Sequence, residues 1–220
     1  MKICALIPAR GGSKGIHLKN IKKVNNIPLI NYSIKAAIES KLINETYLST
    51  DNIKISNIAK KYNNKIKIIG RSKKTSTDQA TTESLIDEFT KLYDYDILVL
   101  IQPTNVFVNS RYLNEGIKKI VEKKNDSLLS VVKAHKFLWS YNNKKFLPLN
   151  YKIGDRPRRQ DSKEFFLENG SFYIFKRTNY LKTRNRLHFN IGQVVMKSES
   201  IFEIDDISDL NIVRKILKKN

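Results

Sequence analysis

Residues 96–101, Asp-Ile-Leu-Val-Leu-Ile, decide the fold of this chain, and Gln102-Pro103-Thr104 follow them directly. The run from 97 to 101 is apolar at every position, so neither side of a strand built from it could face water. That pattern is typical of a central parallel strand that is buried on both faces. In an open parallel sheet, ligands bind at the carboxyl ends of the strands, so the loop after this stretch is a candidate binding site.

Strand and helix patterns alternate on both sides of this stretch. Short apolar runs predict further strands at 3–7, 47–50, 66–69, 128–132 and 171–175. Apolar stripes at helical spacing predict helices around 30–38, 55–62, 85–93, 113–121 and 210–217. The connections are short, which indicates a doubly wound α/β fold with a mostly parallel sheet and helices on both faces. Ser208 is expected to cap the last helix.

The alternation stops between residues 134 and 165. This segment holds Trp139, the pair Asn142-Asn143 and the tetrad Arg-Pro-Arg-Arg at 156–159, and it has no helical stripe. We interpret it as an arm or hairpin inserted into one domain that covers residues 1–220. The alternative is a long surface loop, which is uncommon unless it has a function.

The charge of the chain is strongly positive. Lys and Arg number 41 against 21 for Asp and Glu, a net charge of +20. A nucleic-acid partner is one explanation, and a basic nucleic-acid-binding module, with its best support at 156–159, predicts binding that falls steeply with salt. The lysine pairs are dispersed along the chain, however, which favours solvated faces and makes a nucleic acid unlikely. A polyanionic small molecule such as a nucleotide fits the charge equally well.

Composition also indicates the compartment. Apolar residues make up 40% of the chain, which excludes intrinsic disorder, and Cys4 is the only cysteine, which excludes an internal disulfide or a zinc cluster. No apolar run approaches about 18 residues, so no membrane span is expected. The amino-terminal residues lack the basic region and cleavage site of a secretion signal, so we expect a cytoplasmic protein.

A glycine-rich loop, Ala-Arg-Gly-Gly-Ser-Lys-Gly at 9–15, follows the first predicted strand directly. Glycines let the backbone approach a ligand, while Arg10, Lys14 and Lys19 add positive charge and Asn20 adds a neutral donor and acceptor. This combination suits a polyphosphate. The loop matches neither the Walker pattern nor the dinucleotide fingerprint. The alternative is a tight strand exit with cations that face solvent.

These residues, with several later segments, resemble the CMP-sugar synthetase family in its acylneuraminate (sialic acid-type) cytidylyltransferase branch. The resemblance covers nearly the whole chain and is most specific at 7–15, Ile-Pro-Ala-Arg-Gly-Gly-Ser-Lys-Gly, with Leu-Lys-Asn at 18–20. The other matching segments are 48–51 (Leu-Ser-Thr-Asp), Arg71 with 76–84 (Ser-Thr-Asp-Gln-Ala-Thr-Thr-Glu-Ser), 102–104 (Gln-Pro-Thr), 159–160 (Arg-Gln), 168–174 (Glu-Asn-Gly-Ser-Phe-Tyr-Ile) and 203–210 (Glu-Ile-Asp-Asp-Ile-Ser-Asp-Leu).

The resemblance implies a fold and a reaction. The fold would be Rossmann-like, of the nucleotide-diphospho-sugar transferase type. The enzyme would transfer CMP from CTP to the anomeric hydroxyl of a nonulosonic acid such as an N-acylneuraminate, releasing pyrophosphate with the help of Mg²⁺ or another divalent cation. The arm at 134–165 would make a homodimer that shares loops between subunits, with Phe137, Trp139 and Tyr141 as anchors. Alternatively, these aromatic residues fold back on their own core.

Roles follow by position from the same resemblance. The catalytic cations would be Arg10, Lys14 and Lys19. The nucleotide would also contact Gly11, Gly12, Ser13, Asn20, Arg71, Ala80 and Thr82. The sugar would meet Gln102, Thr104, Arg159 and Asn169. The metal would be held by Asp205 and Glu203, whose side chains share one face if 203–205 form a strand. The alternative for this acidic cluster is helix capping, a role that suits Asp206 and Asp209.

Four positions depart from the family pattern: His17 in place of proline, Val108 and Leu167 in place of arginine, and Glu203 in place of aspartate. The two missing arginines leave the identity of the acceptor open. A legionaminic-type acid, a pseudaminate-like acid or the eight-carbon Kdo are the alternatives, although the Gln-Pro-Thr loop argues against Kdo. The cation for the acceptor carboxylate could come from Arg156, Arg158 or Arg159.

Overall fold

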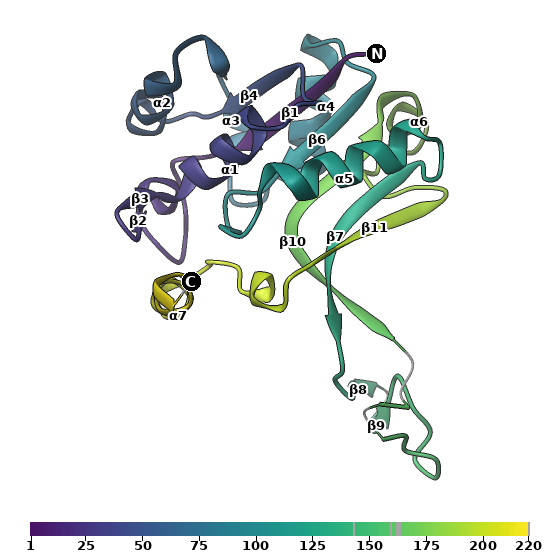
Figure 1. Ribbon diagram of the computed structural model, residues 1–220. Coiled ribbons are helices and arrows are strands. Elements are labelled where there is room, and N and C mark those ends of the chain that lie inside the picture. The colour runs from purple at the N-terminus through teal and green to yellow at the C-terminus, as the bar shows by residue number, and fades with distance from the viewer. Residues whose placement is uncertain (143, 159, 162–163, 220) are drawn as a thin grey trace.

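The computed structural model describes residues 1–142, 144–158, 160–161 and 164–219 (Figure 1). Its main sheet has seven strands in the order β11-β7-β10-β6-β1-β4-β5. They are β1 (Ile3–Pro8), β4 (Glu45–Ser49), β5 (Lys67–Ile69), β6 (Ile97–Ile101), β7 (Ser127–Ala134), β10 (Phe165–Lys176) and β11 (Ile191–Met196). All run in one direction except β10, which is antiparallel to both β6 and β7. The prediction of a mostly parallel sheet with β6 at its centre is confirmed.

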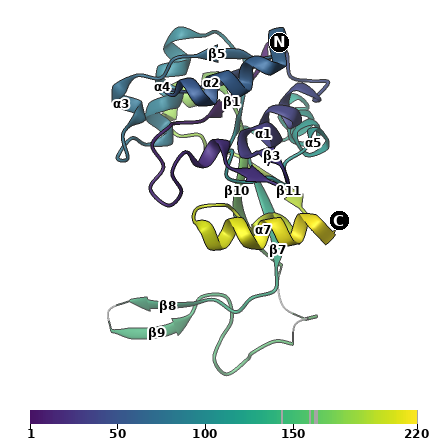
Figure 2. The same ribbon diagram turned by 90° about the vertical axis from the view of Figure 1, so that its left-hand side faces the viewer.

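Helices cover both faces of the sheet, as predicted. Alternate residues of β1 divide between two cores: Ile3 and Ile7 lie in the core with α1 (Leu29–Ile38), α2 (Ile53–Ala59) and α5 (Ser110–Val121), and Leu6 lies in the core with α4 (Thr82–Leu92) and α6 (Arg177–Thr183). Figure 2 shows this arrangement from the side. Removal of these apolar side chains from water is the main force that holds the layers together.

Three features of the fold were not predicted from the sequence. The edge strand β11 alternates exposed and buried positions and starts beside Gly192, so its apolar pattern is weak. Helix α6 was not predicted either. Strand β10 begins at Phe165 rather than near Ser171, and a register shift between Glu168 and Tyr173 interrupts its pairing with β7.

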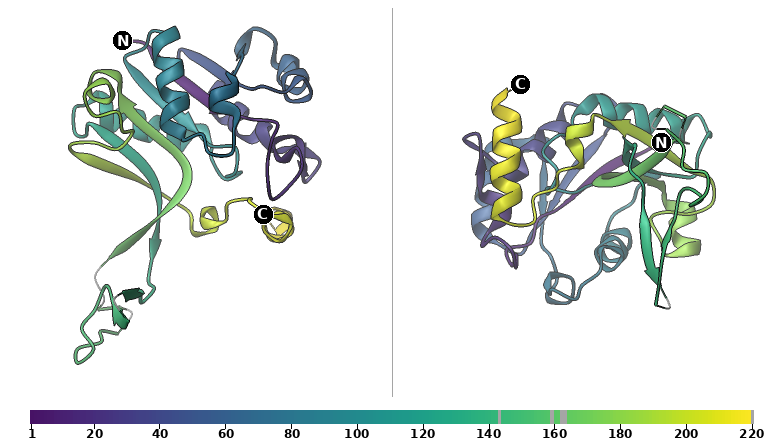
Figure 3. Two further views of the ribbon diagram at one scale, coloured as in Figure 1. Left: turned by 180° about the vertical axis from the view of Figure 1, so that it is seen from behind. Right: turned by 90° about the horizontal axis from the view of Figure 1, so that it is seen from below.

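A third apolar cluster brings the end of the chain beside the first loop. Ile16 and Val24 pack with Ile204 and Val213, so helix α7 (Ile207–Lys219) lies across the short hairpin of β2 (Lys23–Val24) and β3 (Ile27–Pro28) (Figure 3). The cap of α7 differs from the prediction. Asp206 Oδ1, rather than Ser208, accepts the backbone N–H groups of Ser208 and Asp209, at 2.8 and 3.0 Å.

The chain leaves the sheet after Ala134 and rejoins it at Phe165, and the intervening arm projects away from the body (Figure 1). The arm contains a hairpin of β8 (Trp139–Asn142) and β9 (Lys145–Pro148). Trp139 stacks on Phe146 at 4.8 Å between ring centroids, and Phe137 packs on Tyr151 at 4.8 Å. Among the described residues, four aromatic side chains of the arm thus pack on one another and are in none of the core clusters: Phe137, Trp139, Phe146 and Tyr151.

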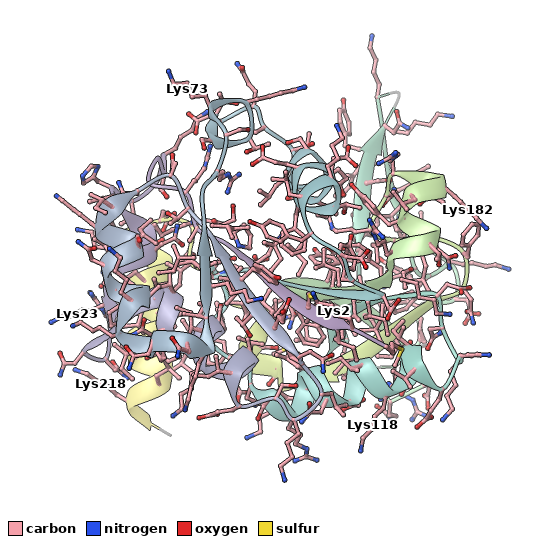
Figure 4. All side chains as sticks on the ribbon, turned by 90° about the horizontal axis from the view of Figure 1, so that it is seen from above. Lys2, Lys23, Lys73, Lys118, Lys182 and Lys218 are labelled. Atoms are coloured by element: carbon pink, nitrogen blue, oxygen red, sulfur yellow. The ribbon has the colours of Figure 1, made fainter. Side chains whose placement is uncertain are left out.

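The short elements that complete the fold are the α3 turn (Lys73–Ser76) and the 3-10 helices η1 (Lys19–Ile21), η2 (Lys60–Lys65) and η3 (Ser198–Ile201). Positive charge is spread over several sides of the molecule: the labelled lysines at its periphery in Figure 4 point in different directions. In the part of the chain that the structure describes, each helix is too short or too polar to cross a membrane.

Candidate functional site: a cationic cavity at the carboxyl ends of the strands

A cavity of about 480 Å³ opens at the carboxyl ends of β1 and β6. This is the edge of the sheet at which the sequence predicted ligand binding. Four separate segments of the chain contribute to its lining, which consists of Pro8, Arg10, Ser13, Lys14, Gly15, Lys19, Asn20, Arg71, Asp78, Ala80, Thr81, Thr82, Leu85, Gln102, Pro103, Thr104 and Asp205.

The first loop is held in place by hydrogen bonds to its own neighbours. Gly11 donates its N–H to Asp51 Oδ1 at 2.7 Å, and the Asn20 side chain donates to the carbonyl of Arg10 at 3.0 Å. The Gly11 N–H is therefore engaged by Asp51, and neither Gly11 nor Gly12 is among the cavity-lining residues. Gly15 is required sterically, because a Cβ at this position would collide with the backbone carbonyl of Asp205.

The cations of the cavity are paired with acids. Arg10 donates to the carbonyl of Thr77 at 2.6 Å and forms an ion pair with Asp78 at 2.8 Å, while Lys14 lies 3.6 Å from the other oxygen of Asp78. Lys19, which is only 14% exposed, pairs with Asp205 at 2.9 Å. The cavity therefore offers several charge-assisted donors that can exchange their present partners for phosphate oxygens.

Arg71 is bonded to the backbone of its own segment. Its Nε donates to the carbonyl of Thr75 at 2.7 Å, and α3 is fixed in turn by Glu88, which accepts from the Ser72 N–H at 3.1 Å. Burial lowers the pKa of the Arg71 guanidinium; the Asp51 carboxylate opposes this shift and the nearby Arg10 charge adds to it. Arg71 and Arg10 thus lie close enough to repel each other, a cost that an anion between them would relieve.

The two predicted metal ligands lie in an irregular segment and not in a strand. The carbonyl of Thr104 accepts the N–H of Ile204 at 2.8 Å, and this contact anchors the segment between η3 and α7. Asp205 lines the cavity and is 73% exposed, whereas Glu203 is partly buried and accepts from Thr104 Oγ1 at 3.2 Å. Burial raises the pKa of Glu203, and the neighbouring Asp205 charge adds to that shift.

Gly170 makes room for Glu203. Its φ angle is +56°, a conformation that favours glycine, and a Cβ at this position would collide with the Glu203 carboxylate. Among the described residues there is no group of three or more His, Cys, Asp or Glu side chains arranged to hold a metal ion. One or two carboxylates with remaining positions filled by substrate oxygens is the usual arrangement for Mg²⁺, so Asp205 and Glu203 fit this ion.

The predicted sugar-binding residues fall into two groups. Gln102 and Thr104 line the cavity. Asn169 is completely buried and does not line it: its amide donates to Ser200 Oγ at 2.9 Å, and its carbonyl accepts from Asn105 at 2.9 Å. Asn169 therefore joins β10 to η3 in this structure. Arg159 lies outside the described residues.

The other candidate arginines lie in the arm. Arg156 stacks over the ring of Phe137 at 4.4 Å, and Arg158 pairs with Asp161 at 2.6 Å. Of the positions that depart from the family pattern, His17 is exposed and Val108 is buried in the core beside α5. Leu167 lies opposite Val132 at the base of the arm.

Asp78 lines the cavity but was not among the predicted site residues. It falls within the 76–84 segment that carried the family resemblance, but nothing local shows that its carboxylate faces Arg10 and Lys14. Thr81 and Leu85, which also line the cavity, lie in or beside the same segment. A pairing between residues 67 positions apart, such as Arg10 with the carbonyl of Thr77, has no signature in the sequence.

Comparison with known proteins settles the family. A family model described as cytidylyltransferase matches residues 4–218. The chain belongs to the cytidylyltransferase family. It is 38% identical over 180 residues to N-acylneuraminate cytidylyltransferase A of Danio rerio, a match that covers 80% of this chain and 41% of that protein.

Two bacterial relatives are similar over nearly the whole chain. The N-acylneuraminate cytidylyltransferase of Escherichia coli is 30% identical over 226 residues, which cover 99% of this chain and 52% of that protein. Pseudaminic acid cytidylyltransferase of Campylobacter jejuni is 27% identical over 232 residues, which cover 100% of this chain and 98% of that protein. The chain thus spans about half, or somewhat less, of the length of the N-acylneuraminate cytidylyltransferases that it matches.

Solved structures confirm the fold. CMP:2-keto-3-deoxy-manno-octonic acid synthetase complexed with CTP superposes with a TM-score of 0.71 at 15% identity, covering 100% of this chain and 99% of that one. The 4-diphosphocytidyl-2C-methyl-D-erythritol synthase of Anaerococcus prevotii superposes with a TM-score of 0.72 at 16% identity. The match covers 99% of this chain and 96% of that one. The predicted nucleotide-diphospho-sugar transferase-like architecture is therefore correct.

Proposed function

We propose that this chain transfers CMP from CTP to the anomeric hydroxyl of a nonulosonic acid and releases pyrophosphate. The observation that carries the proposal is the cavity in which Arg10, Lys14 and Lys19 converge beside Asp205, in a member of the cytidylyltransferase family. Such a cavity suits a ligand with several negative charges and a cation. The proposal concerns the described cavity, since several relatives are about twice as long as this chain.

In the proposed reaction the anomeric oxygen forms a bond to the α-phosphorus of CTP. The bond from that phosphorus to the pyrophosphate oxygen breaks, and the hydroxyl proton leaves to solvent or to a base. Negative charge grows on the phosphate oxygens in the transition state. Arg10 and Lys14 would donate to those oxygens, and Lys19 would share the charge, so the barrier falls through electrostatic stabilisation and alignment of the reactants.

The base and ribose would be held on the other side of the cavity. Arg71, Ala80 and Thr82 line the cavity, and so do Ser13 and Asn20 of the first loop. A small residue at Ala80 leaves room for a flat ring, and Thr82 and Arg71 supply donors. The acceptor would approach from the side of Gln102 and Thr104, which belong to the loop after the central strand β6.

We also propose that Mg²⁺ takes part, held by Asp205 with Glu203. When bound, the ion neutralises phosphate charge and lowers the pKa of the acceptor hydroxyl. The chain's own contribution is positional: Thr104 orients Glu203, and the loop at Gly15 packs against the Asp205 backbone, so nucleotide loop and acidic segment keep a fixed spacing.

A homodimer through the arm completes the proposal. The described arginines of the arm, Arg156 and Arg158, are not among the residues that line the cavity, so we propose that a cation from the arm serves the acceptor carboxylate of a second subunit. We place the reaction in the cytoplasm, in keeping with a single cysteine that is buried and unpaired.

A panel of sugar acids tests the function. Pyrophosphate release is measured with CTP and Mg²⁺ in the presence of N-acetylneuraminate, a legionaminic-type acid, pseudaminate or Kdo, one at a time. We expect release only when CTP, the metal and a nine-carbon acid are all present. N-acylneuraminate-type acids are the first expectation, because the relatives named for them reach 39% identity against 27% for the pseudaminate one. Absence of turnover across the panel contradicts the proposal.

A further inference from the structure

Asp78 stands out because both of its carboxylate oxygens are used by cations of the cavity. One oxygen lies 2.8 Å from the Arg10 guanidinium and the other lies 3.6 Å from Lys14 Nζ. All three side chains line the cavity. Arg10 and Lys14 are also the cations that the proposed function assigns to the triphosphate, so carboxylate and triphosphate require the same two partners.

We propose that Asp78 is an intramolecular competitor of the triphosphate: it holds Arg10 and Lys14 until phosphate oxygens replace it, and takes them back as pyrophosphate leaves. The inference rests on the proposed function and assigns a role to a residue of that same site. Asp78 is thereby a positioning residue, since it acts on the reaction through Arg10 and Lys14.

The ion pairs are suited to exchange. The side chain of Asp78 is 44% exposed and that of Lys14 is 76% exposed, so both are partly hydrated and can separate at little cost. Arg10 is less exposed, at 27%, and its second link is to a backbone carbonyl, that of Thr77, which carries no net charge. Arg10 can therefore stay oriented by Thr77 while its ionic partner changes.

Asp205, the other acid that lines the cavity, differs from Asp78 in the cations available to it. Asp205 pairs with Lys19, and in the proposed reaction it gains Mg²⁺ as a partner when the nucleotide binds. Asp78 gains no such cation: among the described residues its recorded ion pairs are those with Arg10 and Lys14 alone. A carboxylate left beside several phosphate charges is repelled, because like charges a few ångströms apart raise the energy of the complex.

This repulsion predicts how binding depends on the ligand. Each ligand that needs Arg10 and Lys14 must displace Asp78, so the penalty applies to CTP and to pyrophosphate but not to cytidine. Competition by Asp78 therefore weakens the binding of both substrate and leaving group, and speeds the departure of pyrophosphate. If Asp78 instead served only to orient Arg10, its removal would weaken the binding of CTP, which is a change of opposite sign.

The test compares the parent protein with Asp78→Asn by isothermal titration calorimetry, using CTP, inorganic pyrophosphate and cytidine as separate ligands. Asp94→Asn is the matched control: it makes the same change of net charge, and Asp94 is 85% exposed and pairs with Arg177 before the amino end of β6, away from the cavity. Asp78→Ser serves as a second variant in case the amide disturbs the turn.

We expect Asp78→Asn to bind CTP and pyrophosphate about fivefold more tightly than the parent, the scale of one partly exposed ion pair. The gain should shrink as salt is raised, and cytidine binding should not change. In turnover assays the inhibition constant for pyrophosphate should fall by a similar factor, with a lower KM for CTP. Asp94→Asn should match the parent throughout.

Unchanged or weaker binding of CTP by both Asp78 variants, with the parent binding CTP normally, overturns the inference and leaves the proposed function standing. A parent protein that binds neither CTP nor pyrophosphate overturns the proposed function, and the inference with it. An equal gain for cytidine also counts against the inference, because cytidine carries no phosphate for the freed cations.

Discussion

The sheet body and the arm use their surface side chains in opposite ways. In the body, cations converge on one cavity, and Arg10, Lys14 and Lys19 each have an acidic partner. In the arm, aromatic rings stack on one another while apolar side chains such as Leu149 and Ile153 stay more than 60% exposed. The difference teaches that the body brings the residues of the proposed nucleotide site together by itself, whereas the arm leaves apolar surface exposed, which the proposed second copy would cover.

The largest effect is expected at Arg10, one of the cations that line the cavity. We predict that Arg10→Ala lowers kcat by about a hundredfold, the scale of losing one donor that stabilises transition-state charge. Steady-state pyrophosphate release measures the effect, and a thermal melt checks that the fold persists. Arg111→Ala, which removes an exposed arginine of α5, is the control. An unchanged kcat would mean that Arg10 does not stabilise the reacting phosphate, and the contrast between body and arm would lose its chemical basis.

The acidic side of the cavity is the second test. We predict that Asp205→Asn requires about tenfold more Mg²⁺ for half-maximal turnover, because loss of a charged oxygen ligand weakens a metal site. A Mg²⁺ titration of initial rates gives the value. Glu199→Gln removes a carboxylate of η3 and should leave the titration unchanged. Superimposable metal titrations for Asp205→Asn and the parent would contradict the ligand assignment.

The arm is tested through its exposed ring. Tyr141 is 73% exposed, so its truncation removes little packing within the arm. We predict that Tyr141→Ala raises the dissociation constant of the dimer about tenfold, as loss of an aromatic interface anchor does. Analytical ultracentrifugation over a concentration series measures this constant. Leu92→Ala, on an exposed apolar residue of the body, should not change it. A parent protein that stays monomeric at high concentration would refute the arm's proposed role.

The smallest effect is expected at Glu45, where a substitution should change the free energy of unfolding but not kcat. The Glu45 carboxylate accepts hydrogen bonds from Lys67 and Tyr47 and forms an ion pair with Lys2. These contacts lower the pKa of Glu45 to about 2. A carboxyl whose pKa is lowered on folding stabilises the protein above its unfolded-state pKa, and that contribution is lost as pH falls from about 4.5 towards 2.

We therefore predict that Glu45→Gln reduces the free energy of unfolding at pH 7 by about 1 kcal/mol, after allowance for screening by solvent, and by less at pH 3. Urea denaturation at both pH values measures the difference. Glu39→Gln is the control, since Glu39 is half exposed and lies 3.8 Å from Lys35. The kcat should not change. An equal loss at the two pH values would mean that the pKa of Glu45 is not lowered.

Much of the fold was predictable because its signals are local. The all-apolar run of β6 and the stripes of α4 and α5 identify buried strands and amphipathic helices from a few consecutive residues. Strand β11 was missed because an edge strand exposes every second residue and its pattern is weak. The irregular path at 203–205 was also left open, because a shared face for Glu203 and Asp205 required a strand there. Instead the N–H of Ile204 donates to the carbonyl of Thr104 and the N–H of Asp205 donates to Asp209 Oδ2.

The candidate site likewise has features with a local sequence signal and features without one. The glycine loop predicted a group of cations at one place, and Arg10, Lys14 and Lys19 do line one cavity. The buried Asn169, in contrast, shows that a motif residue can be absent from the lining of that cavity. The role of Asp51 in holding Gly11 and that of Asp78 in pairing Arg10 depend on side-chain directions, which are set by packing and have no sequence period.

The sequence by itself determined that this chain forms a mostly parallel sheet with helices on both faces and carries a loop suited to phosphate. Both signals are local, because apolar patterning and glycine content are read from consecutive residues. Only the tertiary structure decided which acid meets which cation. Lys19 and Asp205 are 186 positions apart, and they meet because the cluster of Ile16 and Ile204 folds the end of the chain against the first loop. Charge interactions depend on distance in space, and that distance exists only once the hydrophobic layers have packed.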